Sequence, residues 1–113
     1  MTPAAGFAPI AVLGAGSWGT ALAVQLARGG QPVTLWGRND ADLRDLASHR
    51  VNRRYLPGIE LPASVLPDTD LRRVVGSHRE LLVCAPSHAF RATLAAVLGI
   101  YARETGAGMV FSE

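Results

Sequence analysis

Hydrophobic and polar positions along the chain predict strands that alternate with helices. Residues 9–13 (PIAVL) form a short continuous apolar run, which is typical of a strand covered on both faces in a parallel sheet. Residues 17–28 are rich in alanine and leucine, end in arginine and precede two glycines, which predicts a helix. Residues 32–36 (PVTLW) predict a second strand. The N-terminal third therefore predicts a strand–helix–strand unit.

A second helix is predicted directly after that strand. Asn39 is a favoured N-cap residue, and Asp40 and Asp42 lie in the first turn, where the helix dipole favours negative charge. Apolar residues follow at helical spacing. We expect this helix to end at His49 and Arg50.

Three prolines interrupt residues 51–70, so we expect a loop there, with one short edge strand around residues 63–66. Asp70 is placed to cap a short helix. That helix is expected to run through Val75 and to stop at Gly76.

The remaining residues predict two more strands and one more helix. Residues 80–86 (ELLVCAP) form the clearest later strand, Ser87 is expected to cap the helix, and residues 109–111 (MVF) begin a further strand. The expected apolar face of that helix consists of Phe90, Leu94, Val97 and Leu98. Strands and helices alternating at this spacing imply a parallel sheet with right-handed crossovers. We therefore expect the first part of a doubly wound α/β fold.

Three glycines stand where the first strand meets the first helix. Gly14, Gly16 and Gly19 form the pattern G-x-G-x-x-G, which binds dinucleotides when a strand precedes it and a helix follows. We expect Gly14 to make the tight turn, Gly16 to let the backbone approach a pyrophosphate, and Gly19 to let the helix pack against the strand. The alternative is a junction that merely tolerates glycine. The context and all three glycines favour dinucleotide binding.

The end of the second predicted strand bears on the choice of dinucleotide. NAD sites usually carry Asp or Glu about 20 residues after the glycines. This chain has Arg38 at that place. The nearest acidic residue is Asp40, which is expected to interact with the N-terminus of the following helix. A guanidinium pairs with a 2′-phosphate or stacks on adenine. Arg38 therefore favours NADP or mixed use over strict NAD. The alternative is a solvated surface arginine before a helix cap.

Composition and charge narrow the other function classes. The 113 residues are 49% hydrophobic and 18% charged, which predicts one domain with a packed core. All 11 basic residues are arginines, and they are scattered, so no nucleic-acid partner is expected. No basic residue precedes Arg28, so the apolar N-terminal stretch is interpreted as core rather than as a signal peptide or membrane span.

Few other residues suggest chemistry. His88 follows the fourth predicted strand, at the sheet edge where ligands bind, and either donates to a cofactor phosphate or has no chemical role. Phe90 either flanks a nicotinamide or belongs to the core. Cys84, the single cysteine, excludes an internal disulfide, suits a cytoplasmic setting and is expected to be buried and inert. We find no convincing catalytic set or metal-ligand spacing, so no catalytic or metal-binding residue is predicted.

Four motifs together resemble the N-terminal domain of the bacterial type of NAD(P)-dependent glycerol-3-phosphate dehydrogenase. They are, in chain order, GAGSWGTALA (14–23), LWGR (35–38), NRRYLPGI (52–59) and PSHAF (86–90). The first motif alone is generic, whereas the four together are specific. The resemblance covers nearly the whole chain.

The resemblance implies a Rossmann-type doubly wound parallel sheet, of which this chain holds the first part. It implies an oxidoreductase that interconverts dihydroxyacetone phosphate and sn-glycerol 3-phosphate, for phospholipid synthesis, with NADP or NAD as cofactor. It also implies that Ser17 and Trp18 lie in the cofactor loop and that Arg38 takes the adenosine-side position. Tyr55 and Phe90 are expected to be further cofactor contacts.

The chain departs from the family pattern in one respect. In the family, a Lys-Gly pair after the next strand and a second, helical domain provide the substrate site, whereas this chain contains no lysine. We expect residues 1–113 to be the NAD(P)-binding domain, with the helical substrate domain absent. Hydride transfer to a ketone also needs a proton donor and a group that holds the developing alkoxide. We therefore predict weak cofactor binding, no turnover by this chain alone, and marginal stability or self-association through exposed sheet edges.

Two other interpretations stay open. One is a stand-alone, non-catalytic NAD(P)-binding module. The other is part of a different two-domain dehydrogenase, such as a hydroxyacyl or ketopantoate reductase type. The NRRYLPGI motif (52–59) argues against the second, because a generic dinucleotide-binding domain has no reason to carry that loop.

Overall fold

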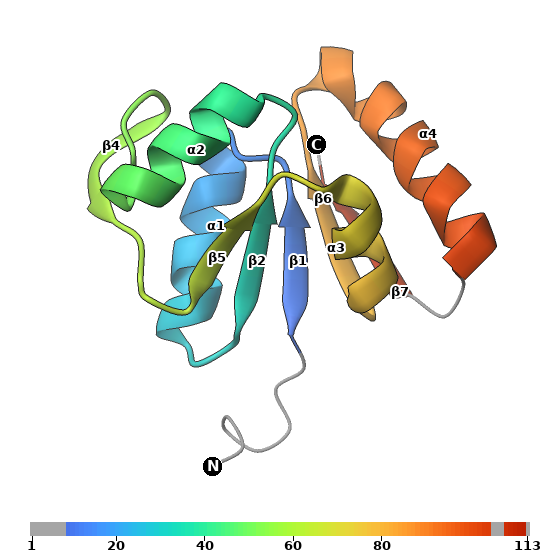
Figure 1. The fold of residues 1–113 in the computed structure, drawn as a ribbon, viewed down its shortest axis with the longest axis horizontal. Helices are drawn as coiled ribbons and strands as arrows, with labels where there is room; N and C mark the ends of the chain where they lie inside the picture. The colour runs from blue at the N-terminus through green and yellow to red at the C-terminus, as the bar shows by residue number, and fades with distance from the viewer. Residues whose placement is uncertain (1–8, 105–107, 113) are drawn as a thin grey trace.

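The computed structural model describes residues 9–104 and 108–112, and its central feature is a parallel sheet (Figure 1). Five strands form this sheet in the order β5-β2-β1-β6-β7, and every neighbouring pair is parallel. The strands are β1 (Ile10–Leu13), β2 (Val33–Trp36), β5 (Val65–Asp68), β6 (Glu80–Cys84) and β7 (Gly108–Ser112). The chain winds outward from β1 to β5 and then returns past β1 to β6 and β7. This reversal is the doubly wound topology that the sequence predicts.

Helices cover both faces of the sheet (Figure 1). In the described residues they are α1 (Ser17–Arg28), α2 (Asp40–His49), α3 (Leu71–Ser77) and α4 (Ser87–Glu104). Val24 of α1 packs with Val12 of β1 on one face, and Val74 of α3 and Val97 of α4 pack with Leu13 on the other. The sheet therefore separates two apolar cores.

The apolar run in β1 follows from this two-sided burial. Successive side chains of a strand point to opposite faces. Val12 belongs to the core on the α1 side, whereas Ala11 and Leu13 belong to the core on the α3 and α4 side. All three side chains are fully buried. A strand in this position has no solvent-facing residue, which is why its sequence does not alternate with polar residues.

The helix starts and stops agree closely with the local signals. Helix α1 has the predicted bounds. The Asn39 side chain accepts a hydrogen bond from the backbone N–H of Asp42 at 3.0 Å, and the Asp70 side chain accepts one from Arg73 at 3.1 Å. Two of the three predicted N-caps, Asn39 and Asp70, are therefore confirmed.

The expectation of a loop over residues 51–70 is wrong in part. Strands β3 (Val51–Asn52) and β4 (Leu56–Glu60) form an antiparallel hairpin there. Pro57 is tolerated in β4 because this two-stranded sheet leaves it exposed and without a second neighbour among the described strands. The predicted edge strand exists as β5, but it starts two residues later than expected. It accommodates Pro67 because it is an edge strand of the main sheet.

Two helix details also differ from expectation. Helix α3 continues through Gly76 and ends at Ser77. Ser87 was expected to be the N-cap that precedes helix α4, but it is the first residue of that helix. Among the side chains of α4 that the structure describes, the buried ones are Ala89, Thr93 and Val97, whereas Leu98 is 46% exposed. Residues four apart share a helix face, and this stripe turns Leu98 toward solvent.

Candidate functional site

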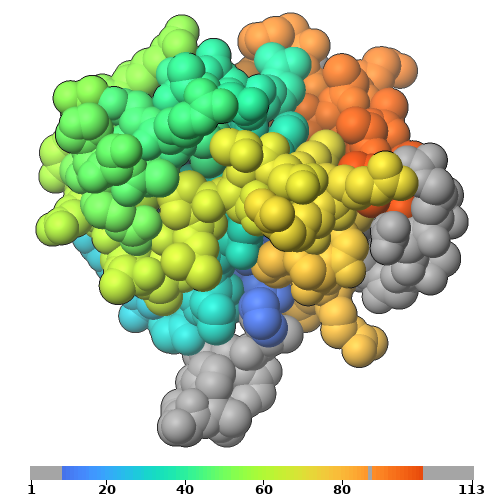
Figure 2. Space-filling model, viewed as in Figure 1, coloured from blue at the N-terminus to red at the C-terminus, as the bar shows by residue number. Residues whose placement is uncertain are grey.

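A groove of about 410 Å³ lies at the carboxyl ends of β1, β2 and β6. This is where the winding direction of the chain reverses, the place where open α/β sheets bind ligands. In Figure 2 the surfaces of α2 (green) and α4 (orange) stand on either side of the β2–α2 connection, near the top of the view. The groove is lined by residues 14–16, 36–39, 42, 43, 54, 55, 84–86, 88 and 93.

Two of the three motif glycines are required by the packing of the protein itself. Gly14 has φ +134°, and a Cβ built there would lie 1.5 Å from the backbone oxygen of Cys84. A Cβ at Gly19 would lie 1.7 Å from the backbone oxygen of Gly14. No side chain fits at either position, because the obstructing atoms are backbone. These glycines bring β1, α1 and β6 into close contact at the groove floor.

Gly16 differs from these two glycines. Its φ of −77° is open to any residue, and a Cβ there would meet no atom of the described chain within 4 Å, sequence neighbours and its own helix aside. Neither backbone conformation nor internal packing explains a glycine here. The absent side chain leaves open the space in front of the loop. That space fits a ligand that approaches the backbone closely.

The N-terminal end of α1 lies at this open space. Gly16 is its N-cap, no side chain of the described residues caps it, and its first turn carries no acidic residue. Helix α2, by contrast, is capped by Asn39 and has Asp40 and Asp42 in its first turn. An N-terminus of the α1 kind presents backbone N–H groups and the positive end of the helix dipole. Its chemistry suits a pyrophosphate.

Asn52 joins the β3–β4 hairpin to the glycine loop. Its Nδ2 donates to the backbone oxygen of Ala15 and to Oγ1 of Thr20, both at 2.8 Å. Its Oδ1 accepts from the backbone N–H of Tyr55 at 3.1 Å. Asn52 is only 6% exposed. Asn52 was not among the predicted site residues, and its only signal in the sequence was its place at the start of NRRYLPGI.

The hairpin turn and the start of α2 form the other side of the groove. Arg38 follows β2 there, as the spacing predicts, and Arg54 and Tyr55 approach from the turn. Arg54 Nη1 lies 3.2 Å from Asp42 Oδ2, and its guanidinium lies 5.1 Å from the centroid of the Tyr55 ring. Asp42 is therefore the acid that lines the groove, and sequence reasoning missed both it and Arg54.

The β6 side of the groove contains Cys84 and His88. Burial raises the pKa of the Cys84 thiol to about 11. The thiol is therefore protonated at neutral pH and is a poor nucleophile, which agrees with the expectation of an inert cysteine. His88 is exposed at the start of α4.

The remaining sequence-predicted residues do not line the groove. Ser17 and Trp18 are exposed in the first turn of α1, directly after Gly16. Phe90 is partly buried against the core between α3, α4 and the sheet. The structure thus brings together Gly14, Gly16, Arg38 and Tyr55, with Ser17 and Trp18 at the adjoining helix end.

Two kinds of feature are absent from the residues that the structure describes. No three His, Cys, Asp or Glu side chains among residues 9–104 and 108–112 are placed to hold a metal ion. Within the same ranges, no helix combines the length and the apolar character that crossing a bilayer requires.

Comparison with known proteins agrees with this geometry. The family model described as NAD-dependent glycerol-3-phosphate dehydrogenase N-terminus matches residues 9–110. The chain is 54% identical over 85 residues to a glycerol-3-phosphate dehydrogenase [NAD(P)+] of Pseudoalteromonas translucida, covering 75% of this chain and 25% of that protein. It is 48% identical over 103 residues to the protein of that name from Xanthomonas euvesicatoria, covering 91% and 30%.

A solved structure is similar as well. The crystal structure of glycerol-3-phosphate dehydrogenase from Coxiella burnetii superposes with a TM-score of 0.86 at 34% identity, covering 94% of this chain and 32% of that one. The chain thus spans about a third or less of the length of these relatives. On its sequence and its fold, this chain belongs to the NAD-dependent glycerol-3-phosphate dehydrogenase family and carries the N-terminal, NAD(P)-binding portion of those proteins.

Proposed function

We propose that this chain is the cofactor-binding part of an enzyme that interconverts dihydroxyacetone phosphate and sn-glycerol 3-phosphate by hydride transfer. The named relatives support the reaction, because they are glycerol-3-phosphate dehydrogenases. The single observation that carries the cofactor site is the open space at Gly16. Residues 1–113 act as one cofactor-binding domain in this proposal. A cytoplasmic location and a role in phospholipid synthesis belong to it as well.

The cofactor assignments follow from the groove. Gly16 and the N-terminus of α1 take the pyrophosphate, with Ser17 and Trp18 in the first turn of that helix. Arg38 and Tyr55 take the adenosine end, because they lie across the groove from β6. Phe90 stays a proposed contact on the family resemblance alone.

The bound nicotinamide supplies the hydride. The residues of this chain bind and orient it, and reduction of a ketone further requires a proton donor and a group that stabilises the developing alkoxide. On the β6 and α4 side, the described groove lining offers His88, the Thr93 hydroxyl and a protonated Cys84 thiol. We assign the substrate phosphate site and the acid–base chemistry to groups outside these 113 residues. The chain alone is then expected not to turn over dihydroxyacetone phosphate.

The test compares three glycine-to-alanine variants by calorimetric titration with NADPH and NADH and by thermal unfolding without cofactor. Gly16→Ala is expected to unfold like the wild type but to bind both cofactors at least about tenfold more weakly, because the new methyl occupies the space of the pyrophosphate. Gly14→Ala is expected not to fold, because its Cβ overlaps the Cys84 backbone.

Gly99→Ala is the matched control. It also adds a methyl that meets no atom of the described chain within 4 Å, and it lies on α4 away from the groove lining. Its cofactor affinity is expected to equal that of the wild type. Wild-type affinity in folded Gly16→Ala would contradict the proposed cofactor site.

A further inference from the structure

The β3–β4 turn carries two neighbouring arginines that differ in their relation to the groove. Arg53 Nε donates to Asp45 Oδ2 at 3.1 Å, farther along α2. Arg54 instead pairs with Asp42, in the first turn of α2. Arg54 and Asp42 line the groove, whereas Arg53 and Asp45 do not. The same turn thus contains a groove arginine and a matched arginine outside the groove.

Arg54 is oriented but still accessible. One of its Nη atoms pairs with Asp42, and its guanidinium plane lies near the Tyr55 ring. Its side chain is nevertheless 62% exposed. A guanidinium has five N–H donors, so a single carboxylate contact leaves capacity for a second anion. Tyr55 is itself fixed through its backbone N–H by Asn52.

The charge of Asp42 gives Arg54 an influence on which cofactor the groove prefers. It is the one carboxylate among the described groove-lining residues. An unpaired carboxylate at the adenosine end accepts hydrogen bonds from the ribose hydroxyls and repels a 2′-phosphate. Arg54 neutralises that carboxylate and adds donors beside those of Arg38. Two arginines and one paired carboxylate in the lining of the same groove suit a phosphate better than a neutral ribose.

We propose that Arg54 is a specificity-determining residue that favours NADP over NAD by binding the 2′-phosphate of the adenosine ribose together with Arg38, and by neutralising Asp42. This inference rests on the proposed function, since it requires a dinucleotide in the groove. It adds a preference for NADP to that function. The preference then depends on Arg54 of the β3–β4 hairpin as well as on Arg38 at the end of β2.

The experiment titrates the 113-residue chain and its Arg54→Gln variant with NADPH and with NADH. Arg54→Gln is expected to weaken NADPH binding about tenfold and to change NADH binding less than about twofold. Arg53→Gln is the matched control and is expected to change neither affinity. The loss for NADPH should shrink in about 0.5 M salt, because exposed charges are screened. Both arginines form exposed ion pairs, so both variants are expected to fold.

A second variant tests the role of Asp42. Asp42→Asn keeps the N-cap, which uses only the backbone N–H of residue 42. It is expected to retain or tighten NADPH binding and to leave NADH binding unchanged. A tenfold loss of NADH binding in Asp42→Asn would overturn the inference, because Asp42 would then read the ribose hydroxyls.

The remaining outcomes separate this inference from the proposed function. Equal losses of NADPH and NADH binding in Arg54→Gln would overturn the 2′-phosphate role and leave dinucleotide binding intact. Wild-type protein that binds neither cofactor would overturn the proposed function and this inference with it.

Discussion

At the scale of single residues, the side chain of Asn52 connects three parts of the groove. It contacts the glycine loop at Ala15, helix α1 at Thr20 and the hairpin turn at Tyr55. An amide is suited to this position because it donates and accepts at the same time. Since the side chain is buried, each of these hydrogen bonds replaces a contact with water.

Asn52→Ala is expected to lower the free energy of unfolding by about 2 kcal/mol, because it leaves buried polar partners unsatisfied. It is also expected to weaken NADPH binding, since the hairpin loses its attachment to the glycine loop. Urea denaturation and calorimetric titration measure the two effects. Thr20→Ser is the control variant, because it keeps the hydroxyl oxygen that accepts the hydrogen bond from Asn52. A change in unfolding free energy below about 0.5 kcal/mol would contradict this role for Asn52.

The sequence pattern predicts a separate role for each of the three motif glycines, and the distances in the structure divide them into two groups. Gly14 and Gly19 share one explanation, the overlap of a Cβ with backbone oxygen, whereas Gly16 faces open space. Spacing correctly marks the motif, because it depends on a turn between adjacent elements. At Gly14 the obstructing oxygen belongs to Cys84 of β6, 70 positions later in the chain, whereas at Gly19 it belongs to Gly14 itself.

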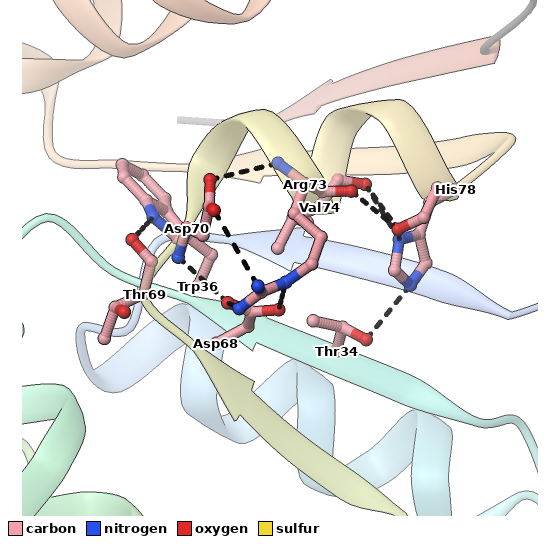
Figure 3. Close-up of polar contacts among 9 residues, drawn as sticks. Thr34, Trp36, Asp68, Thr69, Asp70, Arg73, Val74 and His78 are labelled. Carbon is pink, nitrogen blue, oxygen red and sulfur yellow. Dashed lines mark hydrogen bonds and ion pairs between the residues drawn. The ribbon is translucent and has the colours of Figure 1, made fainter.

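At the scale of elements, the short helix α3 is positioned by polar contacts at both ends (Figure 3). At its start, Arg73 donates to Asp68 at 2.8 and 3.1 Å, and Trp36 Nε1 donates to the backbone oxygen of Thr69 at 3.2 Å. At its end, the His78 ring lies within hydrogen-bond distance of Thr34 Oγ1, at 3.0 Å. These contacts tie α3 to β2 and β5.

The Asp68–Arg73 pair predicts a dependence of stability on pH. Hydrogen bonding from Arg73 lowers the pKa of the Asp68 carboxyl below its ordinary value. Because the unfolded-state value is about 3.9, the stabilisation is complete above that pH and is lost as the pH falls through the folded-state pKa. Asp68→Asn is therefore expected to lower the free energy of unfolding by about 1 kcal/mol or less at pH 7.

Urea denaturation between about pH 7 and pH 2.5 measures this difference. The curves for wild type and Asp68→Asn are expected to stay parallel above about pH 5 and to converge below about pH 4. A difference that stays constant down to the lowest pH would assign the effect to packing rather than to the charge of Asp68.

At the scale of the whole molecule, β5 and β7 are the outer strands of the described sheet. Leu66 on β5 is 60% exposed, and Trp18 near the groove is 55% exposed. Pro67 removes one N–H donor from the β5 edge, which limits but does not abolish pairing with another chain. An apolar side chain on an edge strand favours association.

We expect this chain to self-associate as its concentration rises, with Leu66→Gln reducing the effect. Light scattering after size exclusion, from low-micromolar to sub-millimolar protein, measures the mass. A monomer over the whole range, with a cooperative unfolding transition, would contradict the expectation. Ala95→Gln changes an exposed residue on α4 and is the control for a general gain in solubility.

The sequence by itself determined the elements whose signals are local. The strand–glycine–helix unit at the N-terminus, the caps Asn39 and Asp70, and the arginine after β2 all depend on neighbours within a turn or a strand. Hydrophobic pattern and capping chemistry act over these short distances, so they can be recognised along the chain. The family resemblance added a prediction of the ligand, a nicotinamide dinucleotide.

Only the tertiary structure decided how the groove is completed. Asn52 reaches Ala15 across 37 positions, and the hairpin it anchors brings Arg54 to Asp42. No periodicity encodes such contacts, because they depend on how separate elements pack. The prolines that favoured a loop were misleading for the same reason, since an exposed hairpin and an edge strand tolerate them. Local sequence thus determined where the proposed dinucleotide site lies, and long-range packing decided which side chains surround it.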